Sequence, residues 1–360
     1  MTTNPRDSGV SLSSFFTRCH LPIDARERCD DFVTARFPGL GTGPAPFQGY
    51  CSYTLFVGDA AIVQFRPVEH SIDVEIVREA CAVFGTLVPE VKLLGIMPDN
   101  NNKLRVYYMR RLTGLSLTDF RESLRRQTEA AKAHRRQTVR DFAQFHSQAW
   151  RHARTRGQVG SKGRVGSSLR WRLGMMATSL PERFQRLVNR LMPALPDIEG
   201  LPWTLSHGDF LPSNIMVDPW TGQMSGLLDW AEAEWLPFGV GMYGLEELLG
   251  EVQQGQFTYY PEADKLASLF WKELQSQIHE LRGNPRQLRA VREAQLFGVL
   301  LWHAIAFDDG RLNRVVEEGT DDGEIQRLDA FLLKYKPVPK AGISRFALSS
   351  FLSSILLSRG

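Results

Sequence analysis

The stretch from residue 203 to residue 235 reads WTLSHGDFLPSNIMVDPWTGQMSGLLDWAEAEW. It begins with a polar loop at 207–214 and continues into two short apolar segments, 215–217 and 226–228, joined by a turn rich in Asp, Pro and Gly. Two apolar segments joined in this way predict a β-hairpin. Because the hairpin would return Asp229 to a position beside Asn214, it would bring Asp209, Asn214 and Asp229 to one point.

Two carboxylates and an amide are the groups that phosphoryl transfer requires. One carboxylate can orient an attacking hydroxyl and accept its proton, while an amide oxygen and a second carboxylate can hold the Mg²⁺ ion that bridges nucleotide phosphates. The alternative interpretation is a turn-rich hairpin in which Asp209 and Asn214 only cap local structure.

The composition excludes several classes of protein. The chain has 360 residues, 43% of them hydrophobic, with 43 Lys and Arg against 40 Asp and Glu. It is neither collagen-like nor disordered, and its length predicts about two domains or lobes. Its nearly neutral total charge implies no nucleic acid partner.

The charges are nevertheless unevenly distributed. Residues 121–172 contain fourteen Lys or Arg and only three Asp or Glu. We interpret this segment as mostly a solvated basic face, with an anionic partner or substrate as the alternative. Within it, Trp171 is expected in the core, with Arg170 and Arg172 at the surface.

The four cysteines, Cys19, Cys29, Cys51 and Cys81, show no C-x-x-C spacing. Free thiols in a reducing compartment are therefore expected, and the predicted location is cytoplasmic. No apolar run reaches the ~20 residues that a membrane-spanning helix needs. The apolar, serine-interrupted run at 345–357 predicts an amphipathic helix packed on the body, with attachment to a membrane surface as the alternative.

The chain divides into four parts: a loose N-terminal arm at 1–24, an N-lobe at 25–112, a C-lobe at 113–337 and a tail at 338–360. In the N-lobe, strands at 53–57, 61–65, 89–94 and 104–109 and a helix at 73–84 predict a small antiparallel sheet carrying one helix. Helices are expected in the C-lobe at 118–155, 170–194, 240–252, 262–283, 287–309 and 323–335, with a Gly/Ser-rich loop at 157–168. The predicted fold class is α+β.

The pattern H-G-D-x4-N, followed by an apolar residue and Asp-Trp, resembles the aminoglycoside phosphotransferase family of the protein-kinase-like superfamily. The resemblance extends over about residues 45–335 and implies a bilobal protein-kinase-like fold. It implies that Asp209 is the catalytic base or substrate-orienting acid, that Asn214 and Asp229 bind Mg²⁺, and that His207 braces the catalytic loop. It also implies ATP as co-substrate and a hydroxyl group of a small molecule as acceptor.

The resemblance implies a glycine-containing loop over the phosphates and a basic residue on the third strand. Gly49 and Ser52 are the loop candidates, although G-x-G-x-x-G is absent and an ordinary turn before a strand is the alternative. Gln64 and Arg66 share one face of the third strand by its period of two. Arg66 is favoured as the phosphate contact because a neutral amide cannot balance phosphate charge. Gln64 remains the alternative.

In this family the third-strand cation pairs with a glutamate on the helix, for which Glu79 is the candidate and Glu75, one turn earlier, the alternative. Met109 and Leu112, at the expected hinge, are candidate adenine contacts or ordinary core. Because the third strand has no lysine, a nucleotide-binding pseudokinase with little or no turnover is the alternative function.

The candidate substrate-binding residues are acidic. Glu232 and Glu234 follow Asp229 closely, and further acids occur at 308–324. Acids in this lobe of the family bind amino groups of cationic substrates, which would suit an amine-bearing alcohol. A solvated acidic surface is the alternative, and the sequence leaves substrate identity and oligomeric state open.

Overall fold

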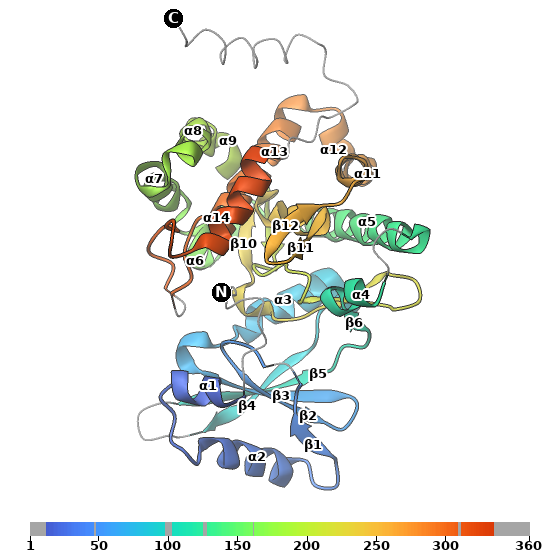
Figure 1. Cartoon of the computed structure of the whole chain (residues 1–360), viewed down its shortest axis with the longest axis vertical. Helices are drawn as coiled ribbons and strands as arrows, with labels where there is room; N and C mark the ends of the chain where they lie inside the picture. The colour runs from blue at the N-terminus through green and yellow to red at the C-terminus, as the bar shows by residue number, and fades with distance from the viewer. Residues whose placement is uncertain are drawn as a thin grey trace, which may run out of the picture.

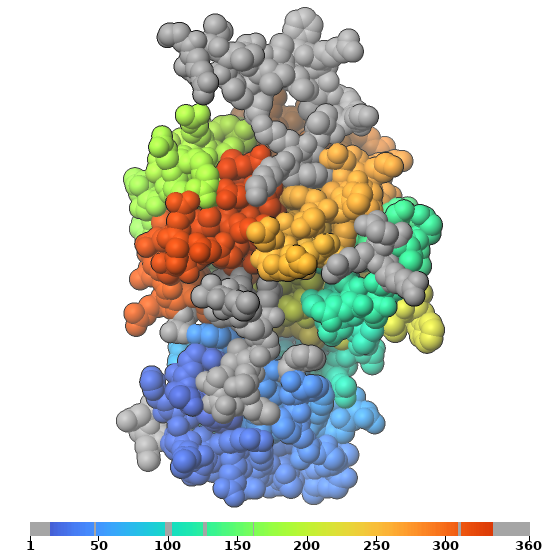
Figure 2. Space-filling view, viewed as in Figure 1, coloured from blue at the N-terminus to red at the C-terminus, as the bar shows by residue number. Residues whose placement is uncertain are grey.

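The computed structural model describes residues 12–46, 48–97, 103–124, 128–160, 162–308 and 311–334. It has two lobes: a small lobe built on a β-sheet and a larger, mostly helical lobe (Figure 1). The space-filling view shows the same division, with the N-lobe in blue below the C-lobe (Figure 2). The predicted α+β bilobal architecture is thus confirmed.

The N-lobe sheet is antiparallel throughout and has the strand order β1-β2-β3-β5-β4. Its strands are β1 (Thr42–Pro44), β2 (Tyr53–Val57), β3 (Ala61–Pro67), β4 (Val91–Met97) and β5 (Leu104–Arg110). Along β3 the side chains alternate between two faces. Ala61, Val63 and Phe65 join one apolar cluster, which leaves Gln64 and Arg66 on the opposite face, toward the C-lobe.

Two helices cover the outer face of this sheet, α1 (Leu12–Arg18) and α2 (Ala25–Arg36) (Figure 1). Phe15 and Phe16 of α1 are buried with Tyr53 and Phe65 of the sheet. The expectation of a loose arm at 1–24 is therefore wrong for residues 12–24, because burial of two phenylalanines anchors this helix. The N-lobe accordingly carries more than the single helix expected.

The helix expected at 73–84 is α3 (Val74–Phe84), which lies between the sheet and the C-lobe (Figure 1). Asp73 caps it by accepting hydrogen bonds from the backbone N–H groups of Glu75 and Ile76. Its apolar stripe ends at Phe84, whose ring stacks on Phe145 of the C-lobe with centroids 4.2 Å apart. The apolar face of α3, which the sequence spacing predicts, thus determines how this helix contacts the C-lobe.

The C-lobe is built around the long helix α5 (Glu129–Arg151), which packs along α11 (Ala263–Gln277). The other helices are α4 (Leu117–Ser123), α6 (Gly163–Gly166), α7 (Leu169–Ser179), α8 (Glu182–Leu191), α9 (Leu195–Glu199), α10 (Gly244–Leu248), α12 (His279–Arg282), α13 (Pro285–His303) and α14 (Asp322–Leu328). Within the described residues, no helix combines the length and hydropathy needed to cross a membrane.

Small sheets complete the C-lobe. One contains β6 (Leu115–Ser116), β8 (Ile215–Val217) and β9 (Met224–Leu227). The second pairs β7 (Trp203–Ser206) with β10 (Glu234–Pro237), and the third pairs β11 (Gly250–Gln253) with β12 (Gln256–Tyr259). The first two of these sheets contain the strands that begin within residues 203–235.

Three details of the C-lobe differ from expectation. The helix predicted at 240–252 ends at Leu248, because Gln254 and Gly255 both adopt positive φ and form a tight turn that closes the β11–β12 hairpin. Trp171 is 53% exposed, whereas Arg172 is buried and donates to Ser168 Oγ and the Leu312 carbonyl. The loop expected at 157–168 contains α6. The tail at 338–360 lies outside the described residues.

Candidate active site

The predicted hairpin is present as β8 and β9. Its last cross-strand hydrogen bond runs from the Leu228 N–H to the Asn214 carbonyl, 2.8 Å apart, so Asp229 emerges next to Asn214. The Asn214 side chain donates from Nδ2 to Asp209 Oδ2 at 2.8 Å and to the Asp209 carbonyl at 3.0 Å. The hairpin therefore brings the backbone of Asp229 beside Asn214, and Asn214 contacts Asp209, while the roles of the three residues stay predictions.

His207 ties the catalytic loop to the end of β9. Its Nε2–H donates to the Leu228 carbonyl at 2.7 Å, and its Nδ1 accepts the Asp209 N–H at 3.2 Å. One donor and one acceptor on the ring require the neutral tautomer with its proton on Nε2. Burial lowers the pKa of His207 to about 4, which keeps the ring neutral near pH 7. The contacts are those of the bracing residue that the resemblance implies.

Gly208 allows the loop to pass close to the segment after Asp229. It has φ +80°, and a Cβ at this position would lie 2.0 Å from the carbonyl oxygen of Glu232. Only glycine satisfies both the backbone angle and this close approach.

Asp229 is held by a cation from the other lobe. Arg66 Nη2 on β3 donates to its two carboxylate oxygens at 3.0 and 3.2 Å, and the arginine side chain is 2% exposed. Asp229 itself adopts the left-handed conformation, with φ +55°, which is uncommon for a residue other than glycine and concentrates at functional sites. Of the two third-strand candidates, Arg66 is the one that reaches this carboxylate. Gln64 lies between Thr54 and Tyr107 of the neighbouring strands.

Glu79 does not pair with the third-strand cation, which corrects the expected ion pair. Its carboxylate accepts a hydrogen bond from Trp235 Nε1 at 2.8 Å and pairs with Arg154 at 3.3 Å. The Arg154 guanidinium also lies 4.0 Å from the centroid of a Trp235 ring. Since Arg66 is engaged by Asp229, the helix glutamate instead fastens α3 to the C-lobe. Neither Arg154 nor Trp235 was singled out from the sequence, because nothing local marks either residue as a partner of Glu79.

The loop at 48–52, which holds the candidates Gly49 and Ser52, leads into β2. The Gln48 side chain binds the backbone of Ala45 and Thr54, which fixes the start of the loop. A Cβ on Gly49 would lie 2.9 Å from Ser52 Oγ, so the two candidate loop residues are in direct contact.

The half-buried thiol of Cys51 lies within range of several charged groups around this loop. Burial raises the pKa of Cys51 to about 12, and the charges of Arg66, Asp229, Glu232 and Arg18 also act on it. The glycine-containing loop therefore lies close to the Arg66–Asp229 pair, where the phosphates of a nucleotide would be expected.

Comparison with known proteins decides the family. A model of the phosphotransferase enzyme family matches residues 48–240, more than half of the chain. This chain belongs to the phosphotransferase enzyme family. The resemblance that the motif indicates is confirmed, and so is the class of enzyme, a phosphotransferase.

Three solved structures illustrate the similarity of this phosphotransferase to known ones. The GDP complex of wild-type aminoglycoside 2'-phosphotransferase-IIIa is 14% identical, with a TM-score of 0.48, covering 78% of this chain and 91% of its own. ADP-bound aminoglycoside phosphotransferase APH(2'')-Ib is 13% identical, with a TM-score of 0.46 and coverages of 93% and 97%. Aminoglycoside-3'-phosphotransferase of type VIII is 15% identical, with a TM-score of 0.46 and coverages of 75% and 98%. Among curated protein sequences, none matches this chain.

The oxygen donors of this phosphotransferase fit a magnesium ion. The described residues contain no cluster of three or more His, Cys, Asp or Glu side chains that could hold a metal by itself. Mg²⁺ needs no such cage, because it is usually bound through one or two protein oxygens together with phosphates and water. Asn214 donates its amide nitrogen to Asp209, so Oδ1 is the atom it would offer to a metal, and Asp229 would offer a carboxylate oxygen.

Met109 and Leu112, at the hinge, are packed as core residues of the phosphotransferase fold. Met109 lies between Ile62 and Val91 of the neighbouring strands and is 6% exposed. Leu112 fills the space left by Gly226, where a Cβ would lie 2.5 Å from its Cδ1. The core alternative accounts for both side chains, and an adenine contact by either stays a prediction.

The two candidate substrate acids differ in their surroundings. Glu232 is exposed, and its charge acts on Cys51 in the loop. Glu234 is 8% exposed and accepts hydrogen bonds from the N–H groups of Val165 and Gly166, at 3.1 and 2.8 Å. Burial raises the pKa of Glu234 to about 7. Glu234 is therefore turned toward α6, and Glu232 is the candidate nearer the chemistry.

Several acidic side chains of the segment 308–324 form ion pairs with arginines. Arg314 bridges Asp308 and Asp321, each at 2.6 Å, and Arg183 binds Glu318. These contacts favour a structural surface for most of the segment.

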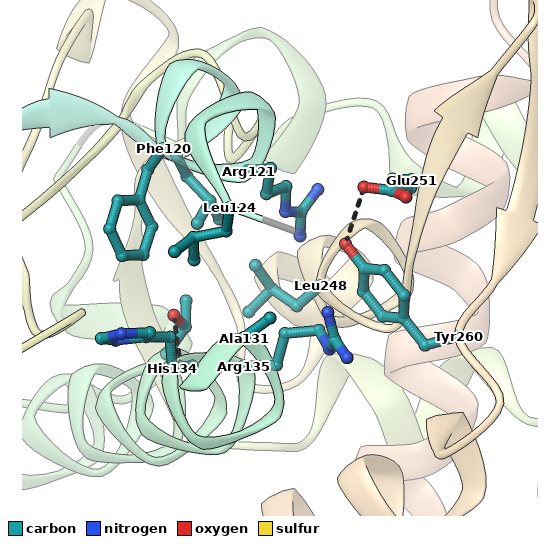
Figure 3. A pocket seen from close by; sticks show the side chains of 11 residues that line it. Phe120, Arg121, Leu124, Ala131, His134, Arg135, Leu248, Glu251 and Tyr260 are labelled. Carbon is teal, nitrogen blue, oxygen red and sulfur yellow. Dashed lines mark hydrogen bonds between the residues drawn. The ribbon is translucent and has the colours of Figure 1, made fainter. Parts of the chain in front are cut away.

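A small cavity lies in the C-lobe between α4, α5, α10 and the β11–β12 hairpin (Figure 3). Arg121, Arg135 and the Tyr260–Glu251 hydrogen bond of 3.3 Å border it, together with apolar side chains. Its volume of about 20 Å³ suits about one water molecule. It is lined by other residues than the candidates above, and it is too small for a nucleotide.

Proposed function

We propose that this phosphotransferase is an ATP-dependent small-molecule kinase that transfers the γ-phosphoryl group to a hydroxyl of a small substrate. The observation that carries the proposal is the convergence of Asp209, Asn214 and Asp229 beside the buried cation Arg66. Phosphoryl transfer depends mainly on positioning and charge neutralisation, and this arrangement supplies both.

In this proposal Asp209 orients the acceptor hydroxyl and takes its proton as that oxygen bonds to the γ-phosphorus. The bond between the γ-phosphorus and the β–γ bridging oxygen breaks in the same transfer, and ADP leaves. Asn214 donates from Nδ2 to one oxygen of that carboxylate, which fixes the orientation of the Asp209 side chain. His207 is neutral and uses both ring nitrogens within the loop, so it positions Asp209 and carries no proton of the reaction.

On the nucleotide side, Asn214 and Asp229 would hold Mg²⁺, which when bound neutralises phosphate charge. Arg66 adds a fixed positive charge at the same place. The loop at 48–52 would cover the phosphates through its backbone N–H groups and Ser52.

The pseudokinase alternative is motivated by the missing third-strand lysine. Against it, Arg66 places a permanent cation beside the metal carboxylate, and the Asp209–Asn214 pair is intact. We therefore favour an active kinase.

For the acceptor, we propose a small alcohol that also bears an amine. Exposed Glu232 near the loop supports this by charge complementarity. ATP as co-substrate and four free cysteines both suit the cytoplasm, which we propose as its location.

The experiment is a screen of small hydroxyl compounds with ADP release as the readout, run in parallel on the wild type and Asp209→Asn. We expect Asp209→Asn to lower turnover at least about 1,000-fold and to change nucleotide affinity less than about threefold. Asp218→Asn, the same carboxylate-to-amide change in the turn of the same hairpin, is the control and should stay near wild type.

Wild-type turnover in Asp209→Asn would overturn the assignment of the base. A wild-type protein that binds Mg-ATP but releases no ADP with any acceptor, and is unchanged by Asp209→Asn, would establish the pseudokinase.

A further inference from the structure

The last residue of α1 reaches the glycine-containing loop. The guanidinium of Arg18 donates to the backbone carbonyl of Tyr50 and lies over the Tyr50 ring, 3.7 Å from its centroid. Two interactions of one cation with one residue, a charge-assisted hydrogen bond and a cation–π contact, fix both the backbone and the side chain of Tyr50.

Arg18 is presented by a firmly anchored helix. Phe15 is fully buried, and Phe16 packs edge-on against Tyr53 of β2 with centroids 5.0 Å apart. The helix ends with the Leu21 N–H bonded to the Phe16 carbonyl and with His20 in the left-handed conformation, a Schellman-type end. Because this end is fixed, the direction of Arg18 toward the loop is set by the fold.

The other side of Tyr50 faces the C-lobe. Its ring meets Phe307 edge-on, with centroids 5.8 Å apart and an interplanar angle of 79°. Phe307 belongs to the segment that follows α13. Tyr50 thus lies between Arg18 of α1 and Phe307 of the C-lobe, so the loop at 48–52 is in contact with the larger lobe.

Arg18 and the Arg66–Asp229 pair have a common neighbour in the loop, Cys51. The thiol of Cys51, next to Tyr50, is subject to the charges of Arg18, Arg66, Asp229 and Glu232 together. Arg18 thus acts on the loop at 48–52 through Tyr50, the residue next to Cys51.

We propose that Arg18 is a positioning residue of the nucleotide site, which holds Tyr50 against Phe307 and so keeps the loop at 48–52 closed over the phosphates. This inference rests on the proposed nucleotide-binding function. Both Arg18 and Phe307 lie outside residues 48–240, the part matched by the family model. The segments that flank the matched region would thus complete the site.

The test measures equilibrium binding of adenosine, Mg-ADP and Mg-ATP to full-length variants by calorimetry. We expect Arg18→Met to weaken ADP and ATP about tenfold, the equivalent of one charged hydrogen bond, and to leave adenosine within about twofold. Arg18→Lys, which keeps a donor and a charge, should recover most of the affinity. Phe307→Leu should weaken ADP and ATP in the same selective way.

Arg36→Met is the matched control, because Arg36 is likewise the last residue of a helix in this lobe and is exposed. It should bind all three ligands as the wild type does. If Arg18 only stabilises the fold, Arg18→Met should lower the affinities for adenosine and ATP equally, and that result would overturn the proposal. Unchanged ATP affinity in Arg18→Met would also overturn it. If Arg18→Met does not fold, Arg18→Lys and Phe307→Leu decide by the same comparison. Failure of the wild type to bind any nucleotide would instead remove the proposed function, and this inference with it.

Discussion

Arg66 of the N-lobe binds both carboxylate oxygens of Asp229 of the C-lobe through a single nitrogen, Nη2. The family resemblance predicts that the third-strand cation pairs with the helix glutamate, yet here that glutamate, Glu79, binds Trp235 and Arg154. The pair expected within the N-lobe is thus replaced by three contacts that each cross to the C-lobe: Arg66 with Asp229, and Glu79 with both Trp235 and Arg154. The position of one lobe relative to the other is therefore coupled to the proposed metal ligand.

Replacement of Arg66 should weaken nucleotide use. We expect Arg66→Met to raise the KM for Mg-ATP about 10- to 100-fold, because a charged hydrogen-bonding group near the phosphates is lost. Arg66→Lys should recover part of the loss, since it restores the charge but not the planar geometry of the guanidinium. Gln64→Leu, on the same face of β3, is the control and should stay within about twofold. A larger effect of Gln64→Leu would assign the phosphate contact to Gln64.

The contact between Glu79 and Trp235 can be measured by a double-mutant cycle on the free energy of unfolding. We expect Glu79→Ala and Trp235→Phe to be coupled by about 1 kcal/mol, the typical net value of one hydrogen bond. Trp235→Phe keeps a ring for Arg154 while removing Nε1–H. The cycle of Glu79→Ala with Arg66→Met should instead be additive. If Glu79 is instead coupled energetically to Arg66 and not to Trp235, the ion pair that the resemblance predicted is present.

Gly208→Ala should disable the catalytic loop. The new Cβ would collide with the carbonyl of Glu232, and alanine is strained at φ +80°. We expect turnover to fall by at least about 100-fold, because the reacting groups would be misplaced. Gly255→Ala isolates the backbone cost, because its φ of +79° is nearly the same and nothing lies within 4 Å of its Cβ. That control should lose about 1 kcal/mol of stability and keep its activity.

Glu234 should make stability depend on pH. Its pKa is raised by burial from an ordinary value near 4.5 to about 7. The folded state therefore holds this proton more tightly, so the contribution of Glu234 to stability is complete below about pH 4.5 and falls as the pH rises to 7. Denaturant unfolding between pH 4.5 and 7.5 should show a steeper decline in the wild type than in Glu234→Gln, by up to about 3 kcal/mol over the interval. Equal slopes would mean that Glu234 does not bind a proton on folding in this range.

The catalytic hairpin was predictable because its determinants are local. His207, Asp209, Asn214 and Asp229 are close in sequence, and the turn at 218–222 dictates that the second strand returns beside the first. The period of two along β3 likewise predicted that Gln64 and Arg66 share a face. Each of these inferences needs only neighbouring residues and regular backbone geometry.

The partners of the charged groups were not predictable in the same way. Arg66 is 163 positions from Asp229, and Glu79 is 156 from Trp235 and 75 from Arg154. Several acids and bases could pair with each of them on grounds of charge alone. The packing of α3 against the C-lobe determines which ones come within reach.

The sequence by itself determined the chemistry, because the spacing of the acids and the amide around one hairpin allows few arrangements. The tertiary structure decided how that chemistry is held. In the folded chain, Phe15 is buried and anchors α1, and Arg18 binds Tyr50. Glu234 is buried against α6, and Arg66 pairs with Asp229. The physical reason is that burial and ion pairing depend on which distant surfaces meet, and the order of residues along the chain does not specify those surfaces locally.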